Sequence, residues 1–176
     1  MVQPDIQRIF DDPASWIHRD WSGAATSKLK GISKGVLNTF LYRLYEFEDG
    51  VPNTFIERQV LLNWNELDRI ALLMACQRHK ATLFQRRDIK LSASLKQFMS
   101  MDIMTSTVDP AVFNVSDLEL LGGREMLILS KAVPPYLANR IVLRTPKRAQ
   151  LQQATQQFNL SLFQIAAQYA KNNDRI

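Results

Sequence analysis

One stretch, Trp64–Leu83, constrains the fold more than any other, because it contains the longest uninterrupted apolar run in the chain. That run, Ile70–Cys76, is seven residues long, whereas a helix that crosses a bilayer needs about 20 apolar residues. Leu67, Ile70 and Met74 follow helical spacing, and further apolar residues occupy the opposite side. A helix that is apolar nearly all round is buried, so we expect the rest of the chain to pack around this one.

Polar residues at both ends of this stretch support the same helix. Asn63 or Asn65 can cap its start, where the positive end of the helix dipole also favours acidic Glu66 and Asp68. The basic segment Arg78–Lys80 suits the opposite end. The core that we predict comprises Leu67, Ile70, Ala71, Leu73, Met74 and Cys76 of this helix, with Phe40, Leu44, Phe98, Ile165 and Tyr169.

Apolar periodicity and helix-start signals predict further short helices. The longest is expected from Ser27 to Phe47, with Gly31 and Gly35 inside it. Its apolar stripe comprises Leu29, Ile32, Val36, Phe40, Leu44 and Phe47. In the first half of the chain we also predict a helical turn after Asp12-Pro13, a helix from Thr54 to Leu62 that starts with a Thr54–Glu57 capping box, and a helix that starts at Ser92. In the second half we predict a turn over Asp117–Leu121 capped by Ser116, a break at Gly122-Gly123, and helices over Arg124–Ala132 and Tyr136–Leu143. Two helices follow: one carries Leu151, Ala154 and Phe158, and the last has Leu162, Ile165, Ala166 and Tyr169 facing inward.

The fold class predicted from these patterns is all-α. We expect a single compact domain over residues 1–176, with about eight short helices around the buried central helix. The segment Met101–Val115 is the least helical, and its Thr, Ser and Pro residues leave a loop or one short irregular β patch as alternatives.

Composition and motif searches exclude several functional classes. The chain is 46% hydrophobic and 22% charged, as in soluble globular proteins, and Met1–Asp12 lacks the apolar region of a signal peptide. The single cysteine, Cys76, is therefore expected to be a core residue in a reducing compartment, the cytoplasm. With only His18 and His79, no metal-ligand spacing occurs, and no nucleotide-binding or hydrolase motif is present. We predict no metal, no cofactor and no enzymatic activity.

The net charge of +5 is unevenly distributed along the chain. Two segments, Trp21–Tyr45 and Met126–Asn173, contain basic residues and no acid, while acids gather in Glu46–Asp68 and Asp102–Glu125. These segments are either solvated faces or a basic surface for an acidic partner. A basic nucleic-acid-binding protein is the competing class, although no nucleic-acid-binding signature accompanies the charge. The residues predicted to contact partners are Lys28, Lys30, Lys34, Arg140, Arg144 and Arg148, together with Trp21 and Tyr136.

Four blocks of the sequence resemble the SctK family of bacterial type III secretion accessory proteins, which includes OrgA, MxiK and the more distant YscK. The blocks are Ile9–Pro13 with Trp16-Ile17-His18; the Trp64, Leu67, Ile70–Ala71, Leu73–Cys76 and Leu83 pattern; Leu121-Gly122 with Val133-Pro134 through Arg140; and Ser161–Lys171. The chain departs from the family pattern at Asp68, where relatives often have proline, and at Ala75, where they often have glycine.

This resemblance implies a mainly helical cytosolic protein of the secretion sorting platform. Such proteins link the cytoplasmic domain of the inner-membrane ring protein, SctD, to the pod protein, SctQ. The resemblance also implies six copies under the ring, so that bivalent binding gains avidity from ring symmetry.

Overall fold

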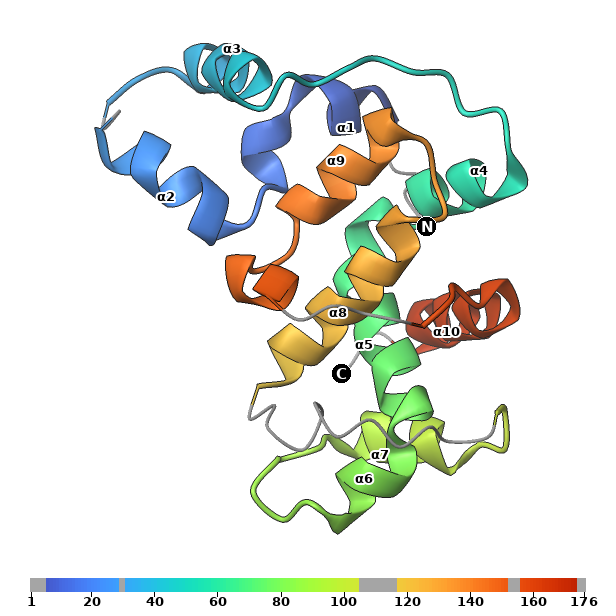
Figure 1. Ribbon diagram of the computed structural model, residues 1–176. Helices are drawn as coiled ribbons and strands as arrows, with labels where there is room; N and C mark the ends of the chain where they lie inside the picture. The colour runs from blue at the N-terminus through green and yellow to red at the C-terminus, as the bar shows by residue number, and fades with distance from the viewer. Residues whose placement is uncertain (1–5, 29–30, 105–116, 152–155, 174–176) are drawn as a thin grey trace.

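The computed structural model describes residues 6–28, 31–104, 117–151 and 156–173, with the side chains of 24–28 and 151 excepted. Within these residues the fold is all-α, as predicted, and no strand is present (Figure 1). The α-helices are α1 (Ile6–Asp11), α2 (Arg19–Lys28), α3 (Lys34–Leu44), α4 (Phe55–Leu62), α5 (Leu67–Arg78), α6 (Lys80–Gln85), α7 (Ala93–Ser100), α8 (Leu118–Ser130), α9 (Pro135–Leu143) and α10 (Leu160–Asn172). Short 3-10 turns lie at η1 (Pro13–Ser15), η2 (Trp64–Glu66) and η4 (Lys147–Leu151).

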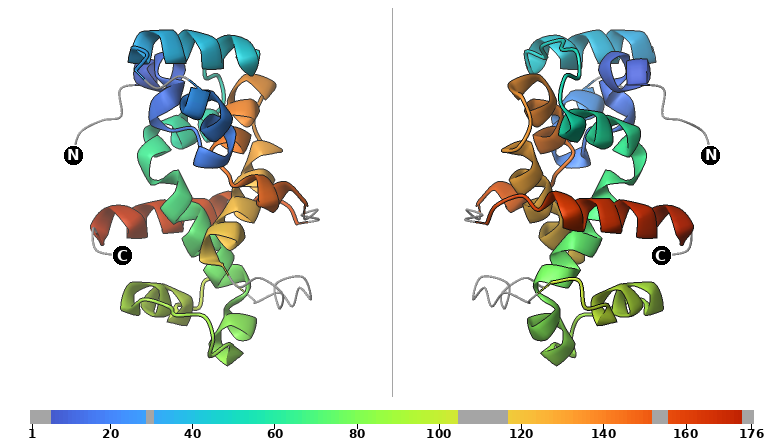
Figure 2. Two further views of the ribbon diagram at one scale, coloured as in Figure 1. Left: turned by 90° about the vertical axis from the view of Figure 1, so that its left-hand side faces the viewer. Right: turned by 90° about the vertical axis from the view of Figure 1, so that its right-hand side faces the viewer.

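Helix α5 is the central helix of the fold. All six of its residues predicted to be core are buried, as are Phe98 of α7 and Tyr169 of α10. Helix α8 packs along α5, and α7 and α10 pack against other parts of it. Figures 1 and 2 show α3 at one end of the molecule and α6 and α7 at the other, with α5 and α8 running between. The prediction of a buried organising helix is confirmed.

Local start signals account for several helix boundaries. The capping box is present, because the Thr54 hydroxyl accepts from the Glu57 N–H while the Glu57 carboxylate accepts from the Thr54 N–H. The Ser92 hydroxyl likewise accepts from the Leu95 N–H at 3.2 Å. Pro13 and Pro135 occupy first-turn positions, where a missing N–H costs nothing. Asparagine capping of the central helix was predicted wrongly: neither Asn63 nor Asn65 caps α5, and the Asn63 amide donates to the Gln59 carbonyl instead.

The predicted continuous helix from Ser27 to Phe47 is not present: α2 ends at Lys28, residues 31–33 are not helical, and α3 runs from Lys34 to Leu44. Gly31 has φ of +90°, a left-handed conformation that glycine adopts without steric cost. The predicted burial of Phe40 and Leu44 is also wrong: their side chains are 42% and 51% exposed, whereas Leu41 is fully buried. The Asn38 side chain fixes this orientation, accepting from the Ala14 N–H at 2.9 Å and donating to Asp12 at 3.0 Å.

The predicted helix break at Gly122-Gly123 is also wrong, because both glycines are buried inside the continuous helix α8. A Cβ atom on Gly122 would lie 3.4 Å from the backbone nitrogen of Leu72 in α5. The glycine thus allows the backbones of α5 and α8 to approach closely, which compensates for its low helix propensity. The cap of α8 is Asp117, whose carboxylate accepts from the Glu119 N–H, and the predicted cap Ser116 lies outside the described residues.

Near the C-terminus, two further predictions need correction. Phe158 precedes α10 in a non-helical segment, so the helix expected to carry it does not extend over residues 156–159, and Ala154 lies outside the described residues. Ile165 is 40% exposed rather than buried, because the buried side of α10 includes Phe163 and Ala167 instead. Most of the segment with undecided structure, residues 105–115, also lies outside the described residues, and residues 101–104 form no strand.

Candidate functional site

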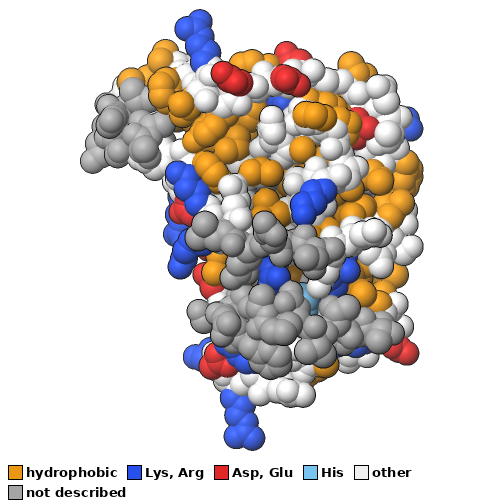
Figure 3. All heavy atoms as spheres, in the orientation of Figure 1, with side chains coloured by type: hydrophobic (Ala, Val, Ile, Leu, Met, Phe, Trp, Pro, Cys, Tyr) orange, Lys and Arg blue, Asp and Glu red, His pale blue; other side chains and the backbone are white. Residues whose placement is uncertain are grey.

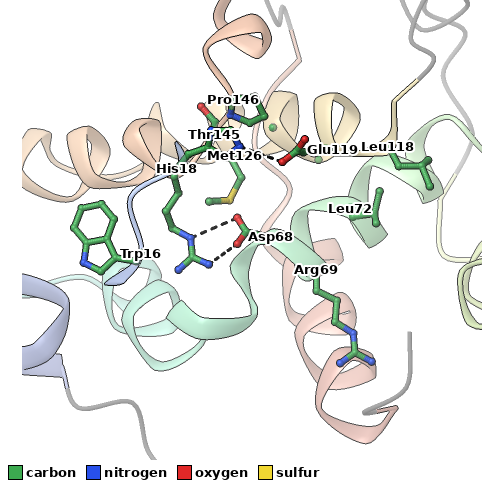
Figure 4. A pocket seen from close by; sticks show the side chains of 13 residues that line it. Trp16, His18, Asp68, Arg69, Leu72, Leu118, Glu119, Met126, Thr145 and Pro146 are labelled. Atoms are coloured by element: carbon green, nitrogen blue, oxygen red, sulfur yellow. Dashed lines mark hydrogen bonds and ion pairs between the residues drawn. The ribbon is translucent and has the colours of Figure 1, made fainter. Parts of the chain in front are cut away.

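A cavity of about 560 Å³ opens between α5, α8, the chain around His18 and the chain after α9 (Figure 4). The apolar side chains of Trp16, Leu72 and Met126 contribute to its wall. Gly122 also lines it, so the close packing of α5 and α8 shapes the cavity. Ionisable side chains stand around this apolar surface, which makes the cavity the first place to look for chemistry.

Two cations line the cavity: Arg69, whose Nη1 lies 3.6 Å from the Glu66 carboxylate, and Arg144, which is fully engaged. Arg144 Nη2 lies 2.5 Å from the Asp68 carboxylate, and its Nη1 donates to the Trp64 carbonyl at 2.8 Å. Its guanidinium also stacks over the Trp64 ring, 5.2 Å from the centroid. Arg144 thereby ties the end of α9 to the start of α5.

The histidine of the cavity, His18, is held between two partners. Its Nδ1 accepts from the Asp20 N–H at 3.1 Å, and its Nε2 lies 3.1 Å from Glu119 Oε1. A ring that accepts at Nδ1 carries its proton on Nε2, so His18 donates to Glu119 and has no lone pair left for a general base. The cavity hydroxyl, Thr145, donates to the Val142 carbonyl at 2.7 Å. Among the described residues, no group of three His, Cys, Asp or Glu residues could hold a metal ion.

The residues predicted from the sequence to contact partners differ in exposure. Lys34 and Arg148 are exposed, and Trp21 is half-buried, with its indole N–H donating to the Thr145 carbonyl at 2.7 Å. Lys30 and the side chain of Lys28 lie outside the described residues. The hydrogen bond to Thr145, together with Lys147 over the Trp21 ring, places Trp21 beside the segment that leads to Arg148.

Arg140 and Tyr136 are buried, which corrects their prediction as surface residues. Arg140 is 0% exposed, donates to the Glu48 and Tyr136 carbonyls, and lies over the Phe10 and Phe47 rings. Burial lowers its pKa, although nearby groups including Tyr42 and Asp49 oppose that shift. Replacing Arg140 therefore tests the fold rather than a partner contact.

The Tyr136 hydroxyl donates to Glu57 at 2.8 Å inside the protein. Burial is the largest cause that raises the pKa of Tyr136, and the hydrogen bond to Glu57 raises it further. Hydrogen bonds from Thr54 and then Tyr136 lower the pKa of Glu57 against the opposing effect of burial. Tyr136 thus extends the capping box of α4 to helix α9.

Two cations of the acid-free segments have acidic partners elsewhere in the chain. Lys34 lies 2.6 Å from Asp12, and Arg144 pairs with Asp68 in α5. These two pairs form because residues far apart in the sequence meet in the fold. That the acid-free segments contact acidic surfaces of partner proteins stays a prediction.

A buried ion pair between α5 and α8 had no sequence signal. Arg78 Nε lies 2.5 Å from Glu125 Oε1, with the two side chains 6% and 3% exposed. Arg78 also donates to the Gln157 carbonyl at 3.0 Å, which connects the chain before α10. Burial raises the pKa of Glu125, while Arg78 and Arg124 oppose this rise. Two charged residues on separate helices can be recognised as a pair only once the helices are packed.

Comparison with known families identifies the chain. The sequence pattern of the family described as bacterial type III secretion apparatus protein (OrgA_MxiK) matches residues 6–172, which is nearly the whole chain and includes every helix that the structure describes. The chain belongs to this family. The resemblance drawn from its sequence blocks is thereby confirmed. Searches of curated proteins and of solved structures returned no significant match.

Helix α3 presents an exposed apolar face, and two of its residues, Phe40 and Leu44, were predicted from the sequence to be buried. Val36, Phe40 and Leu44 of α3 are 55%, 42% and 51% exposed. Figure 3 shows hydrophobic side chains gathered over the end of the molecule where α3 lies. No helix in the described part of the chain is both long and apolar enough to cross a membrane. The amphipathic pattern of α3 was visible in the sequence, but not which side faces outward.

Proposed function

We propose that the chain is a cytosolic structural adaptor of a type III secretion sorting platform. It links the cytoplasmic domain of the inner-membrane ring protein, SctD, to the pod protein, SctQ. The observation that carries this proposal is the family match over residues 6–172, because it assigns nearly the whole chain to a secretion-apparatus component. Six copies under the ring would let individually weak contacts act together.

The arrangement of the helices supports a protein that binds at two places. Helix α3 lies at one end and α6 at the other, joined through α5 (Figures 1 and 2). Each end exposes apolar side chains, with Phe84 of α6 54% exposed. A rigid helical connection between two such ends suits an adaptor that holds its partners at a fixed separation.

The cavity supports a structural role as well. Its ionisable groups pair within the chain: Arg144 with Asp68, His18 with Glu119, and Arg69 with Glu66 outside the cavity lining. The first two contacts join segments far apart in the chain. A catalytic site would instead direct such groups at a substrate position. Nucleic-acid binding, the competing class, loses its main argument because Arg140 is buried and because Arg144 and Lys34 are paired with acids.

A reconstitution with purified proteins tests the proposal. The full chain is mixed with the cytoplasmic domain of SctD, with SctQ, and with both, and the complexes are measured by calorimetry and by light scattering after gel filtration. We expect binary complexes with each partner and a ternary complex that contains all three proteins. Binding to only one partner, or mutually exclusive binding of the two, would contradict the adaptor proposal. A parallel titration with double-stranded DNA at two salt concentrations tests the alternative, which predicts strong, salt-sensitive binding.

A further inference from the structure

The exposed face of α3 is an apolar stripe with a regular helical spacing. Val36, Phe40 and Leu44 are four residues apart, so their side chains follow one another along the same side of the helix. Ile32, in the non-helical segment just before α3, is also exposed, at 42%. The opposite side of α3 is occupied by the core, where Leu41 packs with Ile17, Phe47 and Leu143. The exposed stripe is thus a second apolar face on one helix.

The charges on α3 indicate what kind of surface would cover the stripe. The helix carries Lys34 and Arg43 and no acid. Arg43 is exposed beside the stripe and makes no ion pair with any described residue. Lys34 pairs with Asp12, yet 58% of its side chain remains exposed. A surface that covers this helix with good complementarity is apolar at its centre and acidic at its rim.

A hollow beside the stripe adds shape to the surface. It has a volume of about 350 Å³, lies between α1 and α3, and is lined in part by Phe10, Tyr42 and Arg43. Its acidic residue, Asp11, already accepts hydrogen bonds from the Gln7 amide. Arg43 therefore stands between an apolar stripe on one side and a partly aromatic hollow on the other.

From these features we propose that the outer face of α3 is the docking site for an acid-bearing amphipathic helix of a partner protein. The proposal rests on the proposed adaptor function and assigns one of its two contacts to this face. Apolar side chains of the partner helix cover Val36, Phe40 and Leu44, and its carboxylates face Arg43 and Lys34. This is the helix-in-groove mode of recognition, with anchors three or four residues apart.

The charges of α3 favour a partner helix over two other possible occupants of this face, a second copy of the chain and an anionic membrane surface. A second copy of the chain would present the same acid-free helix, so its Lys34 and Arg43 would supply no acid to the first copy. An anionic membrane surface is usually recognised by a cluster of four to eight Lys or Arg residues. The described helix α3 offers only Lys34 and Arg43 for that purpose. A partner helix needs only the two cations and the stripe.

Binding measurements on the full chain test the proposal. The double variant Val36→Ser/Phe40→Ser is compared with the parent for affinity to the purified SctD cytoplasmic domain and to purified SctQ. Phe55→Ser is the matched control, because Phe55 is 49% exposed on α4. We expect the double variant to bind one partner at least ~10-fold more weakly and the other like the parent, while the control binds both like the parent.

Arg43→Glu guards against a loss caused by misfolding, because the Arg43 side chain is exposed. This variant should weaken the same partner interaction several-fold, with a smaller effect at high salt because ions screen the contact. Circular dichroism confirms that each variant keeps the helical content and melting temperature of the parent.

The remaining outcomes all overturn the inference. If the double variant binds both partners like the parent, or if Phe55→Ser weakens binding equally, α3 is not the docking site and the adaptor proposal stands. If the parent itself binds neither partner, the adaptor proposal fails and the inference fails with it. Two other results replace the partner helix with a different occupant: stripe-dependent dimers in analytical ultracentrifugation, or stripe-dependent sedimentation with phosphatidylglycerol vesicles, each with partner affinity unchanged.

Discussion

The substitution Arg78→Met tests the packing of the central helices directly. Arg78 joins three parts of the fold, since it pairs with Glu125 of α8 at 2.5 Å and donates to the Gln157 carbonyl at 3.0 Å. Methionine keeps most of the apolar stem and removes the guanidinium group. Because the Glu125 side chain is only 3% exposed, water cannot replace the lost cation.

Removing one partner of a buried ion pair costs about 3–5 kcal/mol. That is a large part of the 5–15 kcal/mol by which a typical domain is stable. Burial already raises the pKa of Glu125 while Arg78 opposes the rise, so the pKa of Glu125 increases further in the variant. A carboxyl group whose pKa is raised on folding favours the folded state below its unfolded pKa and loses that contribution as the pH rises through its folded pKa. The deficit of the variant should therefore be small near pH 5 and largest near pH 8.

Urea unfolding followed by circular dichroism at pH 5 and pH 8 measures this deficit. With a slope of about 2 kcal/mol per molar urea, the midpoint at pH 8 should fall by roughly 1.5–2.5 M. The double variant Arg78→Met/Glu125→Leu removes both charges and should recover to within about 1.5 kcal/mol of the parent, with no added pH dependence. The reasoning would be refuted if the single variant had the midpoint of the parent at pH 8. It would equally be refuted if the double variant were no more stable than the single one.

Three further predictions concern the core, the cysteine and the helix cap. Ile70→Ala and Leu73→Ala should each lower the free energy of unfolding by about 2–5 kcal/mol in urea titrations, because both side chains are at most 1% exposed; unchanged midpoints would contradict the central position of α5. Burial raises the pKa of Cys76 to about 12, so a thiol reagent at pH 8 should modify the cysteine only after denaturation, and rapid reaction of the native protein would disprove its burial. Thr54→Ala should cost about 1 kcal/mol through the lost cap. Because hydrogen bonds from Thr54 and Tyr136 lower the pKa of Glu57, their stabilisation is present above the unfolded pKa and is lost as the pH falls through the folded pKa. Urea midpoints of the parent should therefore drop more steeply below about pH 4.5 than those of Glu57→Gln.

The sequence alone determined the fold class, the central helix and several helix boundaries. These features depend on residues close together in the chain: an apolar run bounded by charges, the Thr54–Glu57 capping box, and prolines such as Pro135 at first-turn positions. The resemblance to the secretion family also followed from local blocks of sequence, and the match over residues 6–172 confirmed it.

Only the tertiary structure decided which face of a helix is buried and which charges meet. The apolar stripe of α3 has the period of a core helix, but the side of α3 that packs against the rest of the protein carries Leu41. Phe40 therefore faces solvent. Gly122 has low helix propensity, yet close contact with α5 keeps α8 continuous. Arg140 belongs to an acid-free segment, but the chain folds the Glu48 carbonyl and two aromatic rings around it. Contacts between residues about 25 to 130 positions apart decide these outcomes, and a local stretch of sequence does not reveal them.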